Sequence, residues 1–154
     1  MSDTAGAPRR IVVIGVGHRD RADDGIGPAV VDALSHRTDR VTTVVREGDL
    51  AVLPLLWERD DDVVIVDASL ESSERVGQIH EIDPDQLASS IGLSTHGLNV
   101  ADAIRLAERI GRSPARLRVI GIGAHDFGHG SMSRELHERV NELVDELVVL
   151  LGLD

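Results

Sequence analysis

The side chains best suited to chemistry in this chain are acidic residues and histidines near apolar segments. The pair Asp23 and Asp24 comes shortly after the segment RIVVIGV, and Asp67 ends the segment VVIVD. His96 lies in the segment STHGL, just before a helical pattern. Together these residues offer two oxygen ligands, from one carboxylate of the Asp23–Asp24 pair and from Asp67, and one nitrogen ligand, from His96. Such a set suits a borderline divalent metal with open coordination positions, such as nickel, zinc or iron.

Each of these residues also has an ordinary structural interpretation. Aspartate is a frequent helix N-cap, so one residue of the Asp23–Asp24 pair is expected to cap the helix that follows, which leaves the other free. Asp67 taken alone can cap a loop near Ser69, and a single histidine in a loop is usually solvated. The metal interpretation therefore depends on the three side chains meeting in one site.

Other motifs point to chemistry less strongly. The segment Gly15-Val-Gly17 after an apolar run is typical of a dinucleotide-binding loop, but Asp20 stands where the third glycine is needed. The metal set lacks the helix-borne His-x-x-x-His spacing of zinc peptidases, and no Gly-x-Ser-x-Gly nucleophile motif is present. The segment HDFGHG, from His125 to Gly130, can contribute a ligand or line a substrate groove, and its glycines favour a flexible loop at the rim.

Composition excludes several kinds of chemistry. The chain has no cysteine and no lysine, and all 16 basic residues are arginine. Thiol nucleophiles, thiolate metal sites, Schiff-base lysines and the lysine of a phosphate-binding P-loop are therefore excluded. The net charge of −11 offers no basic surface to a nucleic acid, and the only aromatic residues, Trp57 and Phe127, provide no platform for base stacking. We interpret the acidity as a solubility feature.

The 154 residues fit one compact domain with a sizeable core. No apolar run approaches the roughly 18 residues that a membrane span requires. The N-terminal segment MSDTAGAPRR has no apolar stretch of signal-peptide type. We therefore expect a single domain over residues 1–154, with a flexible tail at residues 1–9, that works in the cytoplasm without a membrane.

Short β-branched runs alternate with longer amphipathic stretches, which is typical of an α/β domain. The pattern predicts strands at Arg10–Val16, Val41–Arg46, Val63–Asp67, Gln78–Ile82 and Leu117–Ile122. It predicts helices at Gly25–Leu34, Leu50–Glu58, Gly97–Ile110 (with a cap at Ser94 and Thr95) and Arg134–Leu151, and one or two helical turns at Pro84–Ser90.

The order of these elements predicts a mainly parallel sheet, because helical crossovers join parallel strands, with one antiparallel strand near an edge. The continuous apolar strand Val63–Asp67 is expected at the centre. Ligands bind outside the carboxyl ends of the strands in such sheets. The acidic pair, Asp67 and His96 are therefore expected at one edge of the sheet.

Four segments, in this order and spacing, resemble the endopeptidases that mature the large subunit of nickel–iron hydrogenases. They are IVVIGVGHRDRADDGIG, VVIVDAS, STHGLNVADAI, and GIGAHDFGHGSMS followed by an amphipathic helix. The first is similar to the family's strand, Gly-x-Gly-Asn loop, acidic pair and second Gly-x-Gly. The second matches its central strand ending in Asp, the third its Ser-x-His segment, and the fourth its C-terminal portion. The resemblance runs from Ile11 to about Leu151.

This resemblance implies a nickel-dependent endopeptidase that removes a short C-terminal peptide from the large-subunit precursor, its partner. It implies that Asp24, Asp67 and His96 are the catalytic residues and contact the nickel already installed in the precursor, for which other divalent ions can substitute. The implied fold is an α/β three-layer sandwich of phosphorylase/hydrolase-like type, with a twisted, mostly parallel five-stranded sheet and helices on both faces. We expect a monomer.

Two positions depart from the family pattern. His18 stands where the family usually has Asn, and is either an additional ligand or the mark of a divergent substrate. Asp24 stands where the family often has Glu, so the loop must approach the metal more closely.

Two other functions remain open. One is a maturation factor that binds the precursor or delivers metal without cleaving. The other is a receiver-like phospho-acceptor domain, which the missing lysine and the late position of the acidic pair disfavour.

Overall fold

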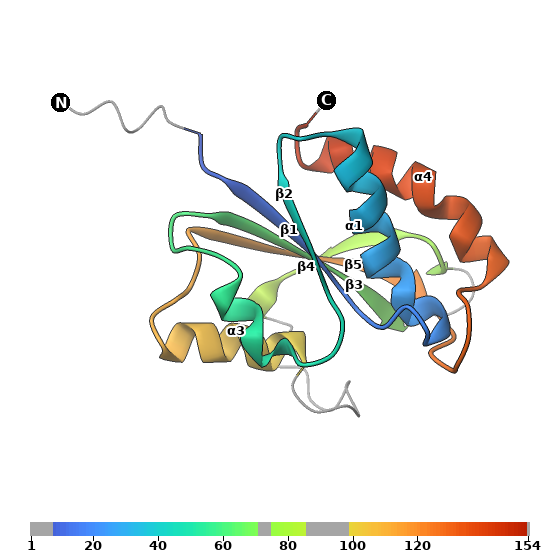
Figure 1. The fold of residues 1–154 in the computed structure, drawn as a ribbon, viewed down its shortest axis with the longest axis horizontal. Helices are drawn as coiled ribbons and strands as arrows, with labels where there is room; N and C mark the ends of the chain where they lie inside the picture. Colours follow the sequence, from blue (N-terminus) through green and yellow to red (C-terminus); the bar gives the residue numbers. More distant parts are fainter. Residues whose placement is uncertain (1–7, 71–74, 86–98, 154) are drawn as a thin grey trace.

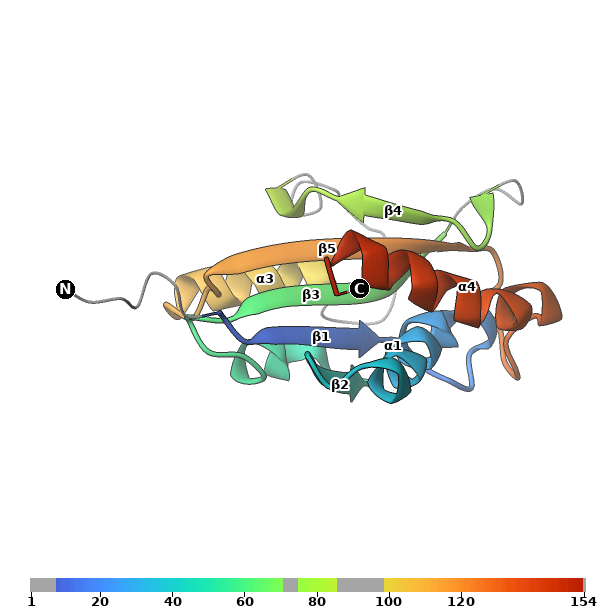
Figure 2. The ribbon, with the colours of Figure 1, turned by 90° about the horizontal axis from the view of Figure 1, so that it is seen from above.

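The computed structural model describes residues 8–70, 75–85 and 99–153, which form a five-stranded sheet between two layers of helices (Figure 1 and Figure 2). The strands lie in the order β2-β1-β3-β5-β4, and β4 is the antiparallel strand at one edge. The mainly parallel sheet, its central third strand and its antiparallel edge strand are thus confirmed. The strands are β1 (Ile11–Val16), β2 (Thr42–Arg46), β3 (Asp62–Leu70), β4 (Ile79–Ile82) and β5 (Arg116–Ala124).

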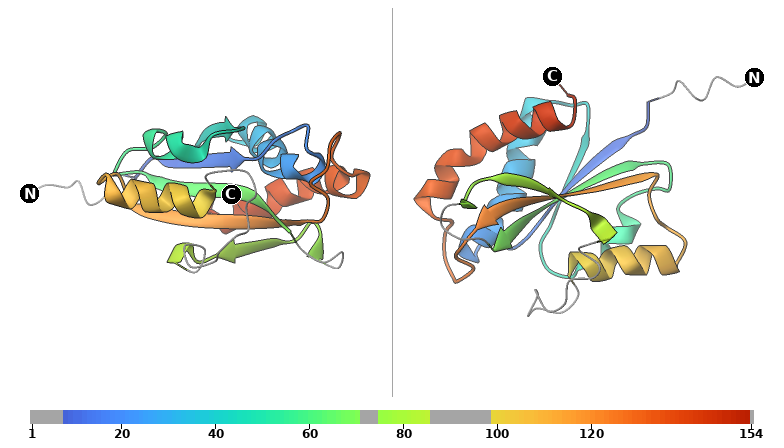
Figure 3. Two further views of the ribbon diagram at one scale, coloured as in Figure 1. Left: turned by 90° about the horizontal axis from the view of Figure 1, so that it is seen from below. Right: turned by 180° about the vertical axis from the view of Figure 1, so that it is seen from behind.

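Helices cover both faces of the sheet, as the views from below and behind show (Figure 3). Helices α1 (Ile26–Arg37) and α4 (Arg134–Leu150) pack on one face. Helix α3 (Val100–Arg109) and the 3-10 helix η3 (Leu50–Leu55) pack on the other. A single 3-10 turn, η2 (Ala22–Gly25), precedes α1. The expected three-layer α/β architecture is therefore confirmed.

Along each strand, alternate side chains pack into two apolar clusters, one on each face of the sheet. In β1, Val13 packs toward α1 and α4, whereas Val12 and Ile14 pack toward α3 and η3. Strand β3 follows the same alternation, and its Ile65 belongs to the cluster under α3. The alternation places Asp67, two residues after Ile65, on the face that α3 covers.

Two predicted elements differ from the observed ones. The predicted helix Leu50–Glu58 is a 3-10 helix that ends at Leu55 and contains Pro54, whose missing N–H cannot take part in an α-helical ladder. The third strand does not end at Asp67 but continues to Leu70, because β5 pairs with it that far. Asp67 is thus inside a strand, where its side chain has a fixed direction.

The start of α3 is capped by Asn99. Its side chain accepts a hydrogen bond from the Asp102 N–H at 2.9 Å, and the Asp102 carboxylate accepts one from the Asn99 N–H at 3.4 Å. The predicted cap at Ser94 and Thr95 lies outside the described residues, as do 86–90 of the predicted turns and 1–7 of the predicted tail. None of the described helices is long and apolar enough to cross a membrane.

The buried Asp61 forms an ion pair with the exposed Arg10 at the amino-terminal end of the sheet, and this pair gives a first prediction. Asp61 is 4% exposed, binds both Nε (3.0 Å) and Nη2 (2.5 Å) of Arg10, and accepts the Glu58 N–H at 2.7 Å. The Arg10 hydrogen bonds hold the pKa of Asp61 below its ordinary value. Replacing Asp61 with Asn should lower the free energy of unfolding by about 1–3 kcal/mol at pH 7, because the Asn amide has one acceptor oxygen in place of the two that accept hydrogen bonds from Arg10 and the Glu58 N–H.

Urea denaturation measures this effect. Because the pKa of Asp61 is lower in the folded state than the ordinary 3.8, its stabilisation is present above that pH and is lost as pH falls below it. The difference between wild type and Asp61→Asn should therefore shrink below about pH 4. The control is Asp62→Asn, since Asp62 pairs with the exposed Arg9 at 3.4 Å. A control as damaging as Asp61→Asn would contradict the assignment.

Candidate functional site

The sheet has a switch point between β1 and β3, because the chain extends the sheet from β1 to β2 on one side and from β3 to β5 on the other. Ligand sites in open α/β sheets form at the carboxyl ends of strands at such a point. Here β1 pairs with β3 only as far as Gly15 opposite Val66, whereas β5 follows β3 to Leu70. Asp67 is therefore the first residue of β3 beyond its pairing with β1.

The first turn of α1 packs tightly against this edge because two glycines carry no side chain. A Cβ on Gly27 would lie 2.6 Å from the carbonyl oxygen of Val66 and 2.7 Å from that of Val16. A Cβ on Gly15 would lie 2.6 Å from the carbonyl oxygen of Gly27. These glycines allow backbone to pack on backbone, so the close approach accounts for them without a bound dinucleotide.

Asp24 is fixed at the same edge by the backbone of its own loop. Gly17 has a φ of 140°, and a Cβ there would lie 2.0 Å from the Asp24 carbonyl oxygen. The His18 N–H donates to Asp24 Oδ2 at 2.9 Å. His18 thus touches the acidic pair through its backbone, and its side chain is half-buried.

The structure places Asp24 and Asp67 close enough to interact electrostatically. Burial, and then the negative charge of Asp24, raise the pKa of Asp67 from 3.8 to about 7, against the effect of a hydrogen bond from the Ala68 N–H. Two carboxyl groups held in this way disfavour ionisation of both. Such an arrangement is common in functional sites, because a bound cation or a shared proton relieves it.

The third residue of the predicted metal set, His96, lies outside the described residues. Among the residues that the structure describes, no group of three or more histidine, cysteine or acidic side chains could hold a metal ion. The described part of the site therefore contains only the two predicted oxygen ligands, Asp24 and Asp67. The complete set of two oxygens and one nitrogen stays a prediction.

Asp23 has a role that the sequence analysis did not predict. Neither Asp23 nor Asp24 caps η2 or α1 through its side chain, so the expected N-cap is wrong. The fully buried Asp23 instead accepts the Ser133 N–H at 2.9 Å through Oδ1, and its Oδ2 lies 3.3 Å from His125 Nδ1. Burial acts to raise the pKa of Asp23, but the hydrogen bonds from Ser133 and His125 outweigh it and hold that pKa below its ordinary value.

The segment from His125 to Gly130 is joined to the loop after β1 by backbone hydrogen bonds. The Ala22 N–H donates to the Gly130 carbonyl oxygen at 2.9 Å, and the Gly130 N–H donates to the Asp20 carbonyl oxygen at 2.9 Å. Within this segment the side chains of His125 and His129 are exposed. The two loops together form one platform beside the acidic pair.

One neighbour of Asp67 was missed because it belongs to no motif. Gly121 of β5 lies opposite Asp67, and His80 of β4 lies opposite Gly121, so the three form one row across the sheet. A Cβ on Gly121 would lie 2.6 Å from His80 Nε2, so the imidazole covers this glycine. The available signal was a glycine inside a strand, which often marks the close approach of another group.

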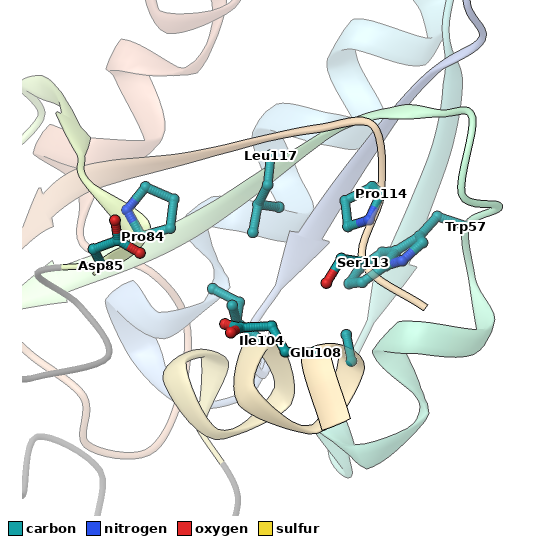
Figure 4. A pocket seen from close by; sticks show the side chains of 9 residues that line it. Trp57, Pro84, Asp85, Ile104, Glu108, Ser113, Pro114 and Leu117 are labelled. Atoms are coloured by element: carbon teal, nitrogen blue, oxygen red, sulfur yellow. The ribbon is translucent and has the colours of Figure 1, made fainter. Parts of the chain in front are cut away.

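A cavity of about 320 Å³ lies away from this site, between α3 and the start of β5 (Figure 4). Trp57, Ile104 and Leu117 supply much of its apolar lining. Leu117 is the second residue of β5, whereas Asp67 pairs with Gly121 further along the same strand. The cavity therefore lies toward the amino-terminal end of the sheet and is separate from the acidic pair.

Comparison with known sequences finds one family over most of the chain. The family described as hydrogenase maturation protease matches residues 28–151. The hydrogenase expression/formation protein HupD of Thiocapsa roseopersicina is 25% identical over 143 residues, which cover 88% of this chain and 64% of that protein. The matched part of the chain thus spans just under two thirds of that relative's length.

Solved structures of two such proteases share the fold. The hydrogenase maturating endopeptidase HybD from Escherichia coli superposes with a TM-score of 0.77 at 23% identity, covering 93% of this chain and 92% of that chain. The nickel–iron hydrogenase maturation protease HycI from Thermococcus kodakarensis gives 0.69 at 25% identity, with 97% of both chains covered. With the family match extending from α1 to the end of α4, the chain belongs to the hydrogenase maturation protease family.

Proposed function

We propose that this protein is a nickel-dependent endopeptidase that removes a C-terminal peptide from the nickel-loaded precursor of a nickel–iron hydrogenase large subunit. The observation that carries the proposal is the pair of Asp24 and Asp67 at the switch point, in a chain of the hydrogenase maturation protease family. On this proposal the protein acts as a monomer in the cytoplasm, and its partner is the precursor itself.

The metal arrives as part of the substrate. Asp24 and Asp67, together with His96, are proposed to contact the nickel that the precursor already carries. Two carboxylates and an imidazole suit this borderline ion. The raised pKa of Asp67 supports the assignment, because a cation beside the pair would offset the repulsion from Asp24 and favour the ionised form. Other divalent ions with the same ligand preferences can substitute.

Peptide hydrolysis also requires proton transfer. The attacking water must lose a proton while its oxygen bonds to the carbonyl carbon, and the leaving amine must gain one when the C–N bond breaks. Asp67, which the bound nickel keeps ionised, is proposed to accept the proton of the attacking water as a general base. The nickel of the precursor supplies Lewis-acid polarisation when it is bound.

The intact mass of a large-subunit precursor, incubated with the protein with and without nickel loaded, tests this proposal. Loss of a defined C-terminal peptide in the nickel-loaded sample alone is expected. No mass change in either sample, with binding demonstrated, would replace the peptidase with a maturation factor that binds without cleaving, and His18→Asn would then be the substitution to examine. Absence of binding would overturn the precursor as partner.

A further inference from the structure

We propose that Asp23 is a positioning residue, whose buried carboxyl group ties η2 to Ser133 at the start of α4 and thereby holds Asp24 in place for cleavage. The proposal rests on the proposed function, since it takes Asp24 as a contact of the nickel in the precursor. Asp23 itself has no part in the proposed reaction and acts only through its neighbour Asp24.

Asp23 and Asp24 are adjacent in η2, but different parts of the fold hold their carboxyl groups. The Asp24 Oδ2 accepts the His18 N–H at 2.9 Å, within the loop after β1. The Asp23 Oδ1 accepts the Ser133 N–H at 2.9 Å, and Asp23 is 0% exposed. Consecutive Cα atoms are about 3.8 Å apart. A shift of the backbone at Asp23 must therefore move Asp24 as well.

Backbone hydrogen bonds join the loop after β1 to the loop after β5. The Ala22 N–H donates to the Gly130 carbonyl oxygen at 2.9 Å, and the Asp23 N–H donates to the Asp126 carbonyl oxygen at 2.8 Å. Ala22 has a φ of 52°, and strained backbone of this kind persists where the surrounding structure over-determines it. Both partners of these bonds lie in loops, and sites held by loops are less precise than sites held by helices or strands.

Ser133 supplies the link to a helix. It is the N-cap of α4, and Leu136 in the first turn of that helix is 0% exposed in the core. A backbone N–H can only donate a hydrogen bond, so the geometry alone makes Asp23 Oδ1 the acceptor. The loop after β1 lies beside the start of α4 in both views (Figure 1 and Figure 2). The Asp23–Ser133 bond therefore connects η2 to a packed helix 110 residues further along the chain.

Because Asp23 is fully buried, loss of this hydrogen bond is expected to move η2. A buried oxygen without its donor carries an uncompensated desolvation cost, which a shift of η2 toward water or another donor relieves. The same shift displaces Asp24. A displacement of about 1 Å at a catalytic site costs about 100-fold in rate, so a shift of about half that size corresponds to about ten-fold.

Two substitutions at Ser133 isolate the N–H group. Ser133→Ala and Ser133→Pro both remove the hydroxyl group that accepts the Leu136 N–H at 3.4 Å, but only Ser133→Pro also removes the N–H. The φ of −58° at Ser133 suits proline. We expect kcat for nickel-loaded precursor to be about ten-fold lower in Ser133→Pro than in Ser133→Ala, with a smaller change in KM.

A double-mutant cycle tests whether the effect passes through Asp23. In Asp23→Ala the Ser133 N–H has no carboxyl acceptor, so the difference in kcat between Ser133→Ala and Ser133→Pro should disappear in this background. The readout is kcat per folded molecule, with the folded fraction measured by circular dichroism, because a variant that is only less stable keeps the kcat of its folded molecules. A difference that persists in Asp23→Ala, or equal kcat values when Asp23 is present, would overturn the proposal.

Should Ser133→Pro fail to fold, Asp23→Asn and Asp23→Ala give the comparison. The amide oxygen of Asn can accept the Ser133 N–H, whereas alanine has no side-chain acceptor. Asp23→Asn should therefore keep a kcat about ten-fold above that of Asp23→Ala. Equal kcat values for these two variants would contradict the positioning role.

Failure of the proposed function gives a different result. If wild type binds the nickel-loaded precursor without cleaving it, the ratio of its affinities for nickel-loaded and nickel-free precursor replaces kcat, because Asp24 is the proposed nickel contact. A ratio about five-fold smaller for Ser133→Pro than for Ser133→Ala then supports the positioning of Asp24 without the peptidase. Equal ratios, or no binding by wild type, would reject it.

Discussion

Replacement of Asp67 with Asn is expected to abolish cleavage of the precursor and, at the same time, to stabilise the metal-free protein at pH 8. The cleavage should fall by about 10²–10⁴-fold, the usual contribution of a positioned acid–base group. The gain in stability follows from the electrostatics of the same carboxyl group. Ionised Asp67 is half-buried and faces the negative charge of Asp24, and an amide of the same shape avoids the cost of that charge.

The pH dependence of this gain has a definite sign. The folded protein binds the Asp67 proton more tightly than the unfolded chain, because the pKa rises from 3.8 to about 7 on folding. The free energy of unfolding of wild type therefore falls as pH rises from about 4 to about 7, by at most about 4 kcal/mol. Asp67→Asn lacks this dependence, so its advantage should vanish near pH 4 and be largest above pH 7.

Thermal unfolding in a chelator at pH 4, 6 and 8 measures the effect, with the exposed Asp60→Asn as control. A gain of several degrees at pH 8 is expected for Asp67→Asn alone, since about 1 kcal/mol corresponds to a few degrees in a domain of this size. An unchanged or lower melting temperature of Asp67→Asn at pH 8 would contradict the raised pKa of Asp67.

His96→Ala should abolish cleavage of the precursor as well. Normal processing by both Asp67→Asn and His96→Ala would reject the roles assigned to these residues.

The fold was predictable because its signals are local. The β-branched runs and the amphipathic helices appear in the sequence with their own periods, and their order fixes a mainly parallel sheet. The rule that loops at the carboxyl ends of parallel strands meet at one edge then brought the Asp23–Asp24 pair and Asp67 together, and the family resemblance selected Asp24 from the pair. That inference needed only the order of the elements, not the contacts of any side chain.

The role of Asp23 was not predictable for the opposite reason. Its partners Ser133 and His125 are 110 and 102 residues away, so no local pattern indicates them. Capping statistics consider only the helix that follows and therefore predicted an N-cap at Asp23 or Asp24. The end of β3 was misplaced similarly, because the apolar run stops at Val66 while pairing with β5 continues the strand.

Replacement of Gly17 with Ala is expected to disable the site by moving Asp24 rather than by removing a reacting group. The φ of 140° at Gly17 is one that side-chain-bearing residues rarely adopt, and the new Cβ would lie 2.0 Å from the Asp24 carbonyl oxygen. The backbone of η2 must therefore shift and carry the Asp24 carboxylate away from Asp67. A displacement of about 1 Å at a catalytic site costs about 100-fold in rate, so cleavage should fall at least that far.

A matched substitution separates strain from displacement. Gly48 also has a positive φ, 95°, but a Cβ there would meet nothing within 4 Å. Gly48→Ala should therefore lose about 1–2 kcal/mol of stability through backbone strain and cleave normally. Gly17→Ala should lose both stability and cleavage, and its Asp67 should titrate at lower pH, because the charge of Asp24 has moved away. Normal cleavage by Gly17→Ala would show that the position of Asp24 does not limit the reaction.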